Sequence, residues 1–99
     1  MNLKELQKWV QEDWDNFSKE KPDPHLQLIY LFEELGEVAE SIRKLTGNKE
    51  RKKIEADLEG EIGDVLIAIA TIANHYNVDL SSAIEKTKKK IVDRHNKGI

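Results

Sequence analysis

The 99-residue sequence has no cysteine, two prolines and five glycines. Without thiols the chain forms no disulfide, has no cysteine nucleophile and offers a metal only oxygen or imidazole ligands. No glycine-rich loop leads into a Lys-Ser or Lys-Thr pair, and no G-x-S-x-G segment occurs, which argues against P-loop and serine-hydrolase chemistry. No apolar run reaches the length of a membrane span, and residues 1–12 lack a signal-peptide core, so we expect a cytoplasmic protein without membrane contact.

Charge is distributed unevenly along the chain, although the net charge is only −3. Neither 26–42 nor 54–85 contains a lysine or arginine, whereas 86–97 is rich in both. Charged residues make up 35% of the sequence and hydrophobic residues 38%, a balance that favours helices with narrow apolar stripes. The sequence therefore predicts acidic helices followed by a basic C-terminal segment.

Apolar residues that recur every three to four positions predict four helices and no strand. Asp23, Asn48 and Asp79 are the expected N-caps of the last three helices, and Gly47 is the expected stop of the second. The charged run 49–53 is a candidate for fraying or looping out. The predicted helices span about 3–17, 24–46, 48–76 and 80–96.

The second predicted helix carries an apolar seam whose members step by four, three, four and three residues, namely Leu28, Phe32, Leu35, Ala39 and Ile42. Short connections between long helices favour antiparallel neighbours. The sequence thus predicts an all-α, up-and-down bundle of about four helices, forming one domain over residues 1–99 with the second and third helices at its centre. We expect oligomerisation to complete the bundle, because a chain this short buries little surface alone.

Two acidic pairs stand three residues apart on these central helices, Glu34 with Glu37 and Glu61 with Asp64. Residues at this spacing share a helical face, so two such pairs on facing helices form a cup of four carboxylates. No lysine or arginine lies within these stretches as an i+4 partner, and Glu33 and Glu37 repel each other.

Clustered carboxylates at the edge of a core raise one another's pKa and require a cation. All-oxygen ligation suits Mg²⁺ or Mn²⁺. The mid-helix glycines Gly36 and Gly63 each cost about 1 kcal/mol relative to alanine, and they predict a close approach of the two backbones. On spacing alone, a solvated acidic face stays open as the alternative.

The two acidic motifs, E-E-L-G-E at 33–37 and E-I-G-D at 61–64, resemble the paired motifs of the MazG-type nucleoside triphosphate pyrophosphohydrolases, within the all-α NTP pyrophosphatase superfamily. The resemblance covers most of the chain. Asp13-Trp14 and the segment 24–28 are similar to dCTP-hydrolysing members, and 61–66 with 78–84 is similar to the usual continuation of the family.

The resemblance implies Mg²⁺-dependent hydrolysis of an NTP or dNTP to its monophosphate and pyrophosphate, in nucleotide-pool housekeeping, with Mn²⁺ as the alternative ion. It implies that Glu34, Glu37, Glu61 and Asp64 bind the metal, with Glu33 beside them to orient or deprotonate water. We expect a homodimer or homotetramer. The identity of the base and sugar is not carried over.

The basic segment offers partners for the phosphates of such a substrate. The family's pattern of lysine, aromatic and arginine is matched loosely by Lys90, Ile91 and Arg94, where isoleucine replaces the aromatic residue. Phosphate contact by Lys90 and Arg94 is a hypothesis, with Lys86 as a lesser candidate, and Trp14 is the candidate for stacking on the base. The alternatives are a solvated helix face for the cations and a core position for Trp14.

Two other functions stay open. A non-catalytic helical interaction module that retained the fold would tolerate Glu34→Gln or Asp64→Asn with no change other than in stability. A nucleic-acid binder with a basic tail would associate in a salt-dependent manner through residues 86–97. The acidic remainder of the chain argues against that binder, so we expect neither a nucleic-acid nor a membrane partner.

Overall fold

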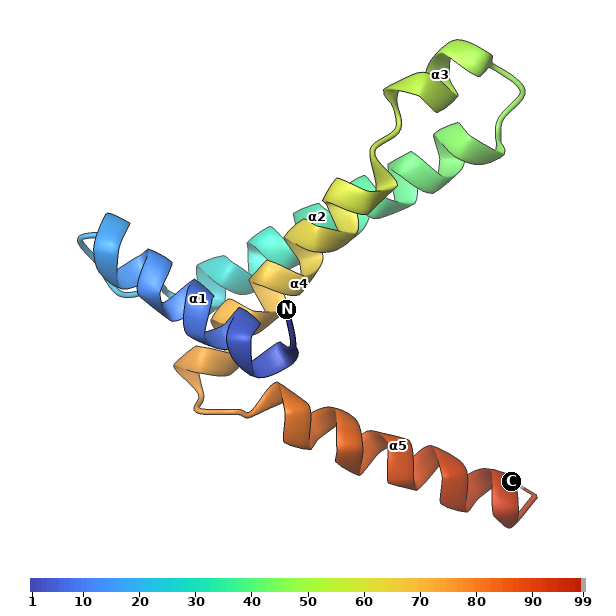
Figure 1. The fold of residues 1–99 in the computed structure, drawn as a ribbon. Helices are drawn as coiled ribbons and strands as arrows, with labels where there is room; N and C mark the ends of the chain where they lie inside the picture. The colour runs from blue at the N-terminus through green and yellow to red at the C-terminus, as the bar shows by residue number, and fades with distance from the viewer. Residues whose placement is uncertain (99) are drawn as a thin grey trace.

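The computed structural model describes residues 1–98, and these form five helices and no strand (Figure 1). The prediction of an all-α fold is confirmed. Four helices are long and the third is short. In chain order they are α1 (Leu3–Phe17), α2 (Pro24–Thr46), α3 (Glu50–Glu55), α4 (Leu58–His75) and α5 (Leu80–Asn96).

Side-chain caps explain where the long helices begin. The side chain of Asn2 accepts a hydrogen bond from the amide of Glu5, and the Glu5 carboxylate accepts one from the amide of Asn2, which forms a capping box. Asp23 caps α2 and Asp79 caps α5, as the sequence predicts. These short polar residues satisfy amides in the first helical turn that have no partner within the helix.

The prediction of one helix from 48 to 76 is wrong, because the chain leaves helical geometry at Ala56 and Asp57. Asn48 lies in a bend and does not cap α3, whose N-cap residue Lys49 makes no side-chain hydrogen bond. Asp57 instead accepts a hydrogen bond from the amide of Gly60 and starts α4. Apolar residues keep their helical spacing across residues 56–57, so the sequence pattern does not reveal the break between α3 and α4.

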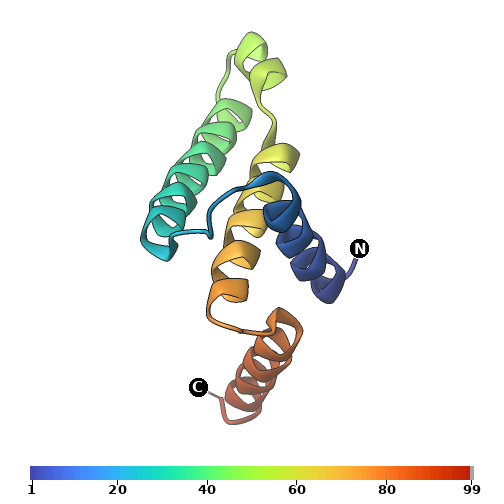
Figure 2. The same ribbon diagram turned by 90° about the vertical axis from the view of Figure 1, so that its left-hand side faces the viewer.

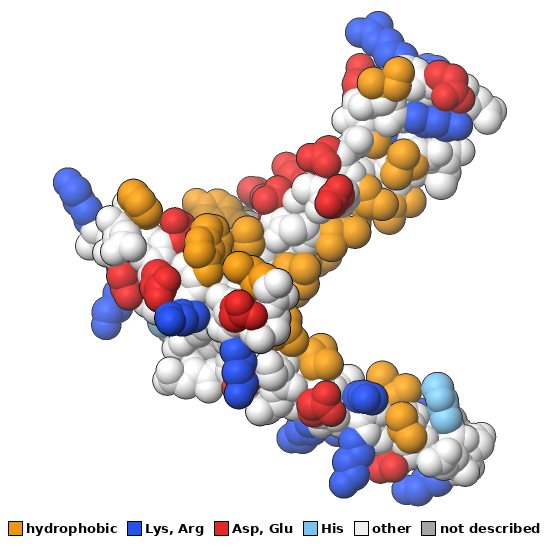
Figure 3. All heavy atoms as spheres, in the orientation of Figure 1, with side chains coloured by type: hydrophobic (Ala, Val, Ile, Leu, Met, Phe, Trp, Pro, Cys, Tyr) orange, Lys and Arg blue, Asp and Glu red, His pale blue; other side chains and the backbone are white. Residues whose placement is uncertain are grey.

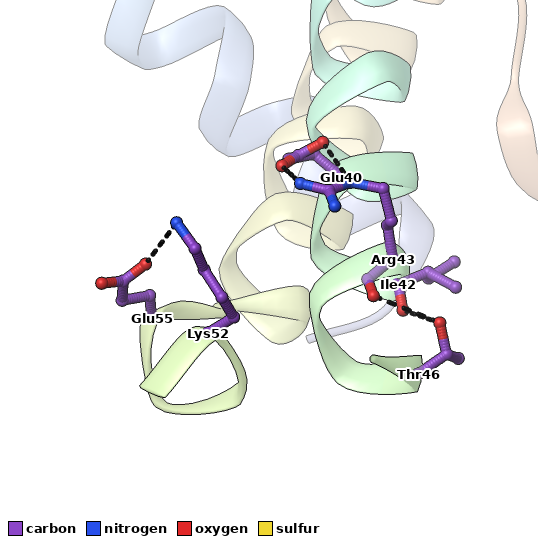
Figure 4. Close-up of polar contacts among 6 residues, drawn as sticks. All are labelled: Glu40, Ile42, Arg43, Thr46, Lys52 and Glu55. Carbon is purple, nitrogen blue, oxygen red and sulfur yellow. Dashed lines mark hydrogen bonds and ion pairs between the residues drawn. The ribbon is translucent and has the colours of Figure 1, made fainter. Parts of the chain in front are cut away.

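Ion pairs between residues three or four apart stabilise the end of α2 and the short helix α3 (Figure 4). Arg43 pairs with Glu40 on α2, and Lys52 pairs with Glu55 on α3. The hydroxyl of Thr46 donates to backbone carbonyls in the last turn of α2. The charges of the segment 49–55 are therefore largely satisfied within their own turns.

The centre of the fold is the antiparallel pair of α2 and α4, which make the most extensive helix–helix contact. The α2 face toward this contact contains Gln27 and Ser41, both buried, with the half-buried residues Leu31, Glu34 and Val38 between them. The seam of Leu28, Phe32, Leu35 and Ile42 was predicted to be core but is exposed, with 66% of Phe32 accessible. The residues of this seam have the same spacing as those of the face toward α4, but each lies one position further along the chain. The seam therefore lies on another side of the helix.

Helix α1 packs against α4. Val10 on α1 is buried, as are Ala70 and Ala73 in the second half of α4. Small side chains on α4 allow the two helices to approach closely, and this contact forms much of the small apolar core within one chain.

Helix α5 leaves the other helices after a short turn and projects away from α2 and α4 (Figures 1 and 2). None of its residues is buried. The radius of gyration is 16.8 Å, compared with about 13 Å for a compact chain of this length. The single chain is thus extended. No helix within residues 1–98 is both long enough and apolar enough to cross a membrane.

Candidate metal and nucleotide site

The structure brings the four predicted carboxylates together between α2 and α4. One ligand oxygen from each of Glu34, Glu37, Glu61 and Asp64 can be chosen so that all four lie within 4.8 Å of one another. Glu34 and Glu61 are half-buried, and Glu37 and Asp64 are exposed. Acidic side chains also gather on this part of the surface in Figure 3, beside uncovered hydrophobic ones. The cup is open on one side and can admit a ligand.

The buried oxygens of this cluster have no hydrogen-bond donor. Oε2 of Glu34 and Oε2 of Glu61 are both inaccessible to solvent and without a partner. Within residues 1–98, no lysine or arginine forms an ion pair with any of the four carboxylates. Burying a carboxylate without compensation is costly, so these oxygens fit a bound cation.

Electrostatics within the cluster oppose ionisation. A hydrogen bond with the Glu37 carboxyl group, burial and the nearby charges raise the pKa of Glu61 to about 7. Burial, followed by the charges of Glu37 and Asp64, raises the pKa of Glu34 above its ordinary value. A divalent cation would remove this repulsion and return both groups to the ionised form. The donor set therefore fits Mg²⁺ or Mn²⁺.

Glu33 lies beside the cluster but is not one of its four converging groups. Its side chain is exposed, and its charge contributes to the raised pKa of Glu34. This position allows Glu33 to contact water next to the four converging carboxylates.

The other predicted substrate-binding residues lie elsewhere in this chain. Lys86, Lys90 and Arg94 are on α5, which contacts α1 and projects away from the carboxylate pairs. Trp14 lines a cavity of about 490 Å³ between α1, the 18–22 connection and the end of α4. Thr71 lines the same cavity and lies seven residues beyond Asp64, which is about 10 Å along the axis of α4. A single chain thus brings the four carboxylates together but does not bring the basic and aromatic candidates to them.

Sequence reasoning missed the cap that positions the second carboxylate pair. Asp57 accepts from the amide of Gly60, and a Cβ atom at Gly60 would lie 2.3 Å from Asp57 Oδ2. Gly60 therefore leaves room for the capping carboxylate one residue before Glu61. The signal was an aspartate three residues before a glycine, but the apolar rhythm across it favoured an unbroken helix.

The glycines Gly36 and Gly63 do not mark a close approach of α2 and α4. No atom outside the local helix lies within 4 Å of a Cβ built on either residue. The predicted backbone contact is wrong within this chain, and both positions face open space instead.

Fold and site together define an all-α protein with a carboxylate cluster of the kind that binds divalent cations. Residues 23–99 match the family described as the MazG nucleotide pyrophosphohydrolase domain, so the chain belongs to the MazG family. It is a nucleotide pyrophosphohydrolase of a metal-dependent family.

The chain is similar to individual proteins and solved structures over most of its length. YpjD of Bacillus subtilis (strain 168) is 32% identical over 94 residues, which cover 93% of this chain and 85% of YpjD. The crystal structure of the Bacillus-conserved MazG protein, a nucleotide pyrophosphohydrolase, has a TM-score of 0.76 at 30% identity and covers 92% of this chain and 90% of that one. The structure of iMazG from Vibrio DAT 722 has a TM-score of 0.68 at 29% identity and covers 97% of each chain.

Proposed function

We propose that this protein hydrolyses a nucleoside or deoxynucleoside triphosphate to its monophosphate and pyrophosphate with Mg²⁺ held by Glu34, Glu37, Glu61 and Asp64. The observation that carries the proposal is the set of four converging carboxylates, two with buried oxygens that lack any donor. The reaction class follows from membership of the MazG family. The cellular role we propose is removal of unwanted nucleotides from the cytoplasmic pool.

The chain's own residues have distinct roles in this proposal. Glu34 and Glu61 are preorganised by burial between α2 and α4, and Glu37 and Asp64 close the cup from its exposed side. Glu33 accepts a hydrogen bond from the attacking water and orients it toward the α-phosphorus. A magnesium ion held by these four carboxylates would lower the pKa of water and neutralise charge on the phosphates.

Positive side chains and an aromatic ring complete the proposed site. Lys90 and Arg94, assisted by Lys86, contact the β- and γ-phosphates, because these cations follow one another at four-residue intervals on α5. Trp14 stacks on the base from its cavity. Since α5 and Trp14 lie away from the carboxylates of their own chain, we propose that a second copy supplies them.

The amount of exposed surface supports a homo-oligomer. The single chain exposes 7937 Å² at a mass of 11.4 kDa, whereas a compact monomer of that mass exposes about 5,800 Å². The excess of about 2,100 Å² is comparable to what one subunit buries in an obligate interface. The exposed α2 seam of Leu28, Phe32, Leu35 and Ile42 is the apolar surface we expect a partner to cover.

The proposal is tested by incubating the full chain with Mg²⁺ and a panel of NTPs and dNTPs, and by quantifying monophosphate and pyrophosphate. Glu34→Gln and Asp64→Asn are expected to abolish pyrophosphate release while helical circular dichroism is retained. Glu59→Gln is the matched control, since Glu59 is an exposed acid of α4 outside the cluster. Diphosphate and orthophosphate as the only products would contradict the reaction. Equal activity of all variants would contradict the site.

A further inference from the structure

One cluster of polar contacts joins residues that are distant in the sequence. It connects Gln7 on α1 with Asn74 near the end of α4 and with the backbone of Val78 and Leu80 at the start of α5. Apart from the contact between the Glu37 and Glu61 carboxyl groups in the cluster, the other side-chain hydrogen bonds and ion pairs within residues 1–98 link residues no more than four apart. These are therefore the polar side-chain contacts that can fix helices relative to one another.

Both ends of the Gln7 amide group form hydrogen bonds in this cluster. Its Oε1 accepts from the amide of Leu80 at 2.9 Å, and its Nε2 donates to the carbonyl of Val78 at 2.8 Å and to Oδ1 of Asn74 at 3.0 Å. In return, Nδ2 of Asn74 donates to the carbonyl of Gln7 at 2.9 Å. Because a backbone amide only donates and a carbonyl only accepts, the orientation of the Gln7 amide is unambiguous.

Gln7 contacts the turn on both sides of the α5 N-cap. Asp79 satisfies the amides of Ser81 and Ser82, and Gln7 satisfies the preceding amide, that of Leu80. The same side chain binds the carbonyl of Val78, the residue before the cap. These two hydrogen bonds of Gln7, one to the residue before Asp79 and one to the residue after it, restrict the backbone dihedral angles that set the direction of α5.

Helix α5 has few other contacts to fix its direction, because none of its residues is buried, only its first turns are half-buried, and its main helix–helix contact is with α1. Lys90 lies ten residues beyond Leu80, about 15 Å along the helix. A rotation of about 20° at the turn would therefore move Lys90 by about 5 Å. Such a movement is larger than the range of donor–acceptor distances over which Lys90 could keep a hydrogen bond to a phosphate oxygen.

We propose that Gln7 is a positioning residue for the triphosphate-binding face of α5, holding the α4–α5 turn so that Lys86, Lys90 and Arg94 reach the phosphates. The assignment rests on the proposed function, since it takes these cations to be phosphate ligands. Gln7 itself touches neither substrate nor metal. Its loss is expected to weaken substrate binding and leave the carboxylate cluster intact.

The test compares two variants with a control. Gln7→Met keeps the length of the side chain and removes all three amide hydrogen bonds. Gln7→Glu keeps an acceptor for the amide of Leu80 and loses the donor to Val78. Asn16→Met is the matched control. It removes an amide side chain from the same helix, and the Asn16 side chain is exposed and forms no hydrogen bond within residues 1–98. Circular dichroism checks that each variant is folded.

Steady-state kinetics with Mg²⁺ and the best triphosphate of the panel give the first readout. Gln7→Met is expected to raise KM by about tenfold, the effect of losing one charge-assisted contact, while kcat stays within about twofold. Gln7→Glu is expected to give an intermediate KM, and Asn16→Met an unchanged one. An unchanged KM for Gln7→Met, or a loss confined to kcat, would overturn the proposal.

A distance measurement gives the second readout, and it does not depend on activity. Since the chain has no cysteine, Glu12→Cys and Lys88→Cys provide unique spin-label sites on α1 and α5. With labelled chains diluted in unlabelled protein, Gln7→Met is expected to broaden the α1–α5 distance distribution, and Asn16→Met is not. An unchanged distribution would overturn the role of Gln7. If the parent protein hydrolyses no triphosphate, the proposed function fails, and this distribution still decides whether Gln7 holds α5.

Discussion

Binding of magnesium to the carboxylate cluster is expected to release protons near neutral pH. A carboxylate must be ionised to bind the metal, and the pKa of Glu61 in the metal-free protein is about 7. A shared hydrogen bond with Glu37 and burial hold it there. Ordinary exposed carboxylates have lost their protons well below this pH, so they would release none.

The expected size of the release follows from that pKa. About half a proton should leave Glu61 per cluster at pH 7, about nine tenths at pH 6 and about a tenth at pH 8. The apparent affinity for magnesium should be about twofold lower at pH 7 and about tenfold lower at pH 6 than in the alkaline limit. Glu34, whose pKa is also raised, adds release in the same direction as the pH falls.

Isothermal titration calorimetry measures this release directly. Titrations of magnesium into the protein at one pH, in buffers of different ionisation enthalpy, give the number of protons released as the slope of observed heat against buffer enthalpy. The slope is expected to fall from pH 6 to pH 8, and Asp64→Asn should remove the binding heat. A slope of zero at both pH 6 and pH 7, with magnesium bound, would refute the electrostatic account of the cluster.

Three further predictions concern stability and assembly. The pKa of Glu61 in the folded state lies above its ordinary value of 4.5, so the folded state holds the extra proton between these pH values. The stability of the metal-free protein should therefore fall as the pH rises from about 4.5 through about 7, and thermal unfolding with and without Mg²⁺ checks this. Asp57→Ala removes the N-cap of α4 and should lower the unfolding free energy by about 1 kcal/mol in urea titrations, whereas no change would contradict the cap. Phe32→Lys places a charge on the exposed α2 seam and should shift the sedimentation mass toward one chain, and a mass equal to that of the parent would exclude this face as the interface.

The helices and the acidic site were largely predictable from sequence because each depends on local spacing. Asp23 and Asp79 cap the helices that they were expected to cap. The i,i+3 spacing of Glu34 with Glu37 and of Asp64 with Glu61 places each pair on one face of its helix. This placement follows from helix geometry and does not depend on contacts with other segments. Membership of the MazG family, expected from the two acidic motifs, is confirmed.

Features that depend on contacts between distant residues could not be read in the same way. The seam through Phe32 has the rhythm of a core, but Gln27 and Ser41 occupy the contact with α4 instead. Periodicity shows that a face is apolar and does not say whether the same chain or another one covers it. The hydrogen bonds of Gln7 join residues more than sixty positions apart, and no local pattern signals them.

The most direct test of the central claim is hydrolysis in ¹⁸O-labelled water with Mg²⁺ and the best triphosphate of the panel, followed by mass spectrometry of both products. Attack of water on the α-phosphorus at the carboxylate cluster predicts one ¹⁸O atom in the monophosphate and none in the pyrophosphate. Label in the pyrophosphate, or label in orthophosphate with a diphosphate product, would contradict the account.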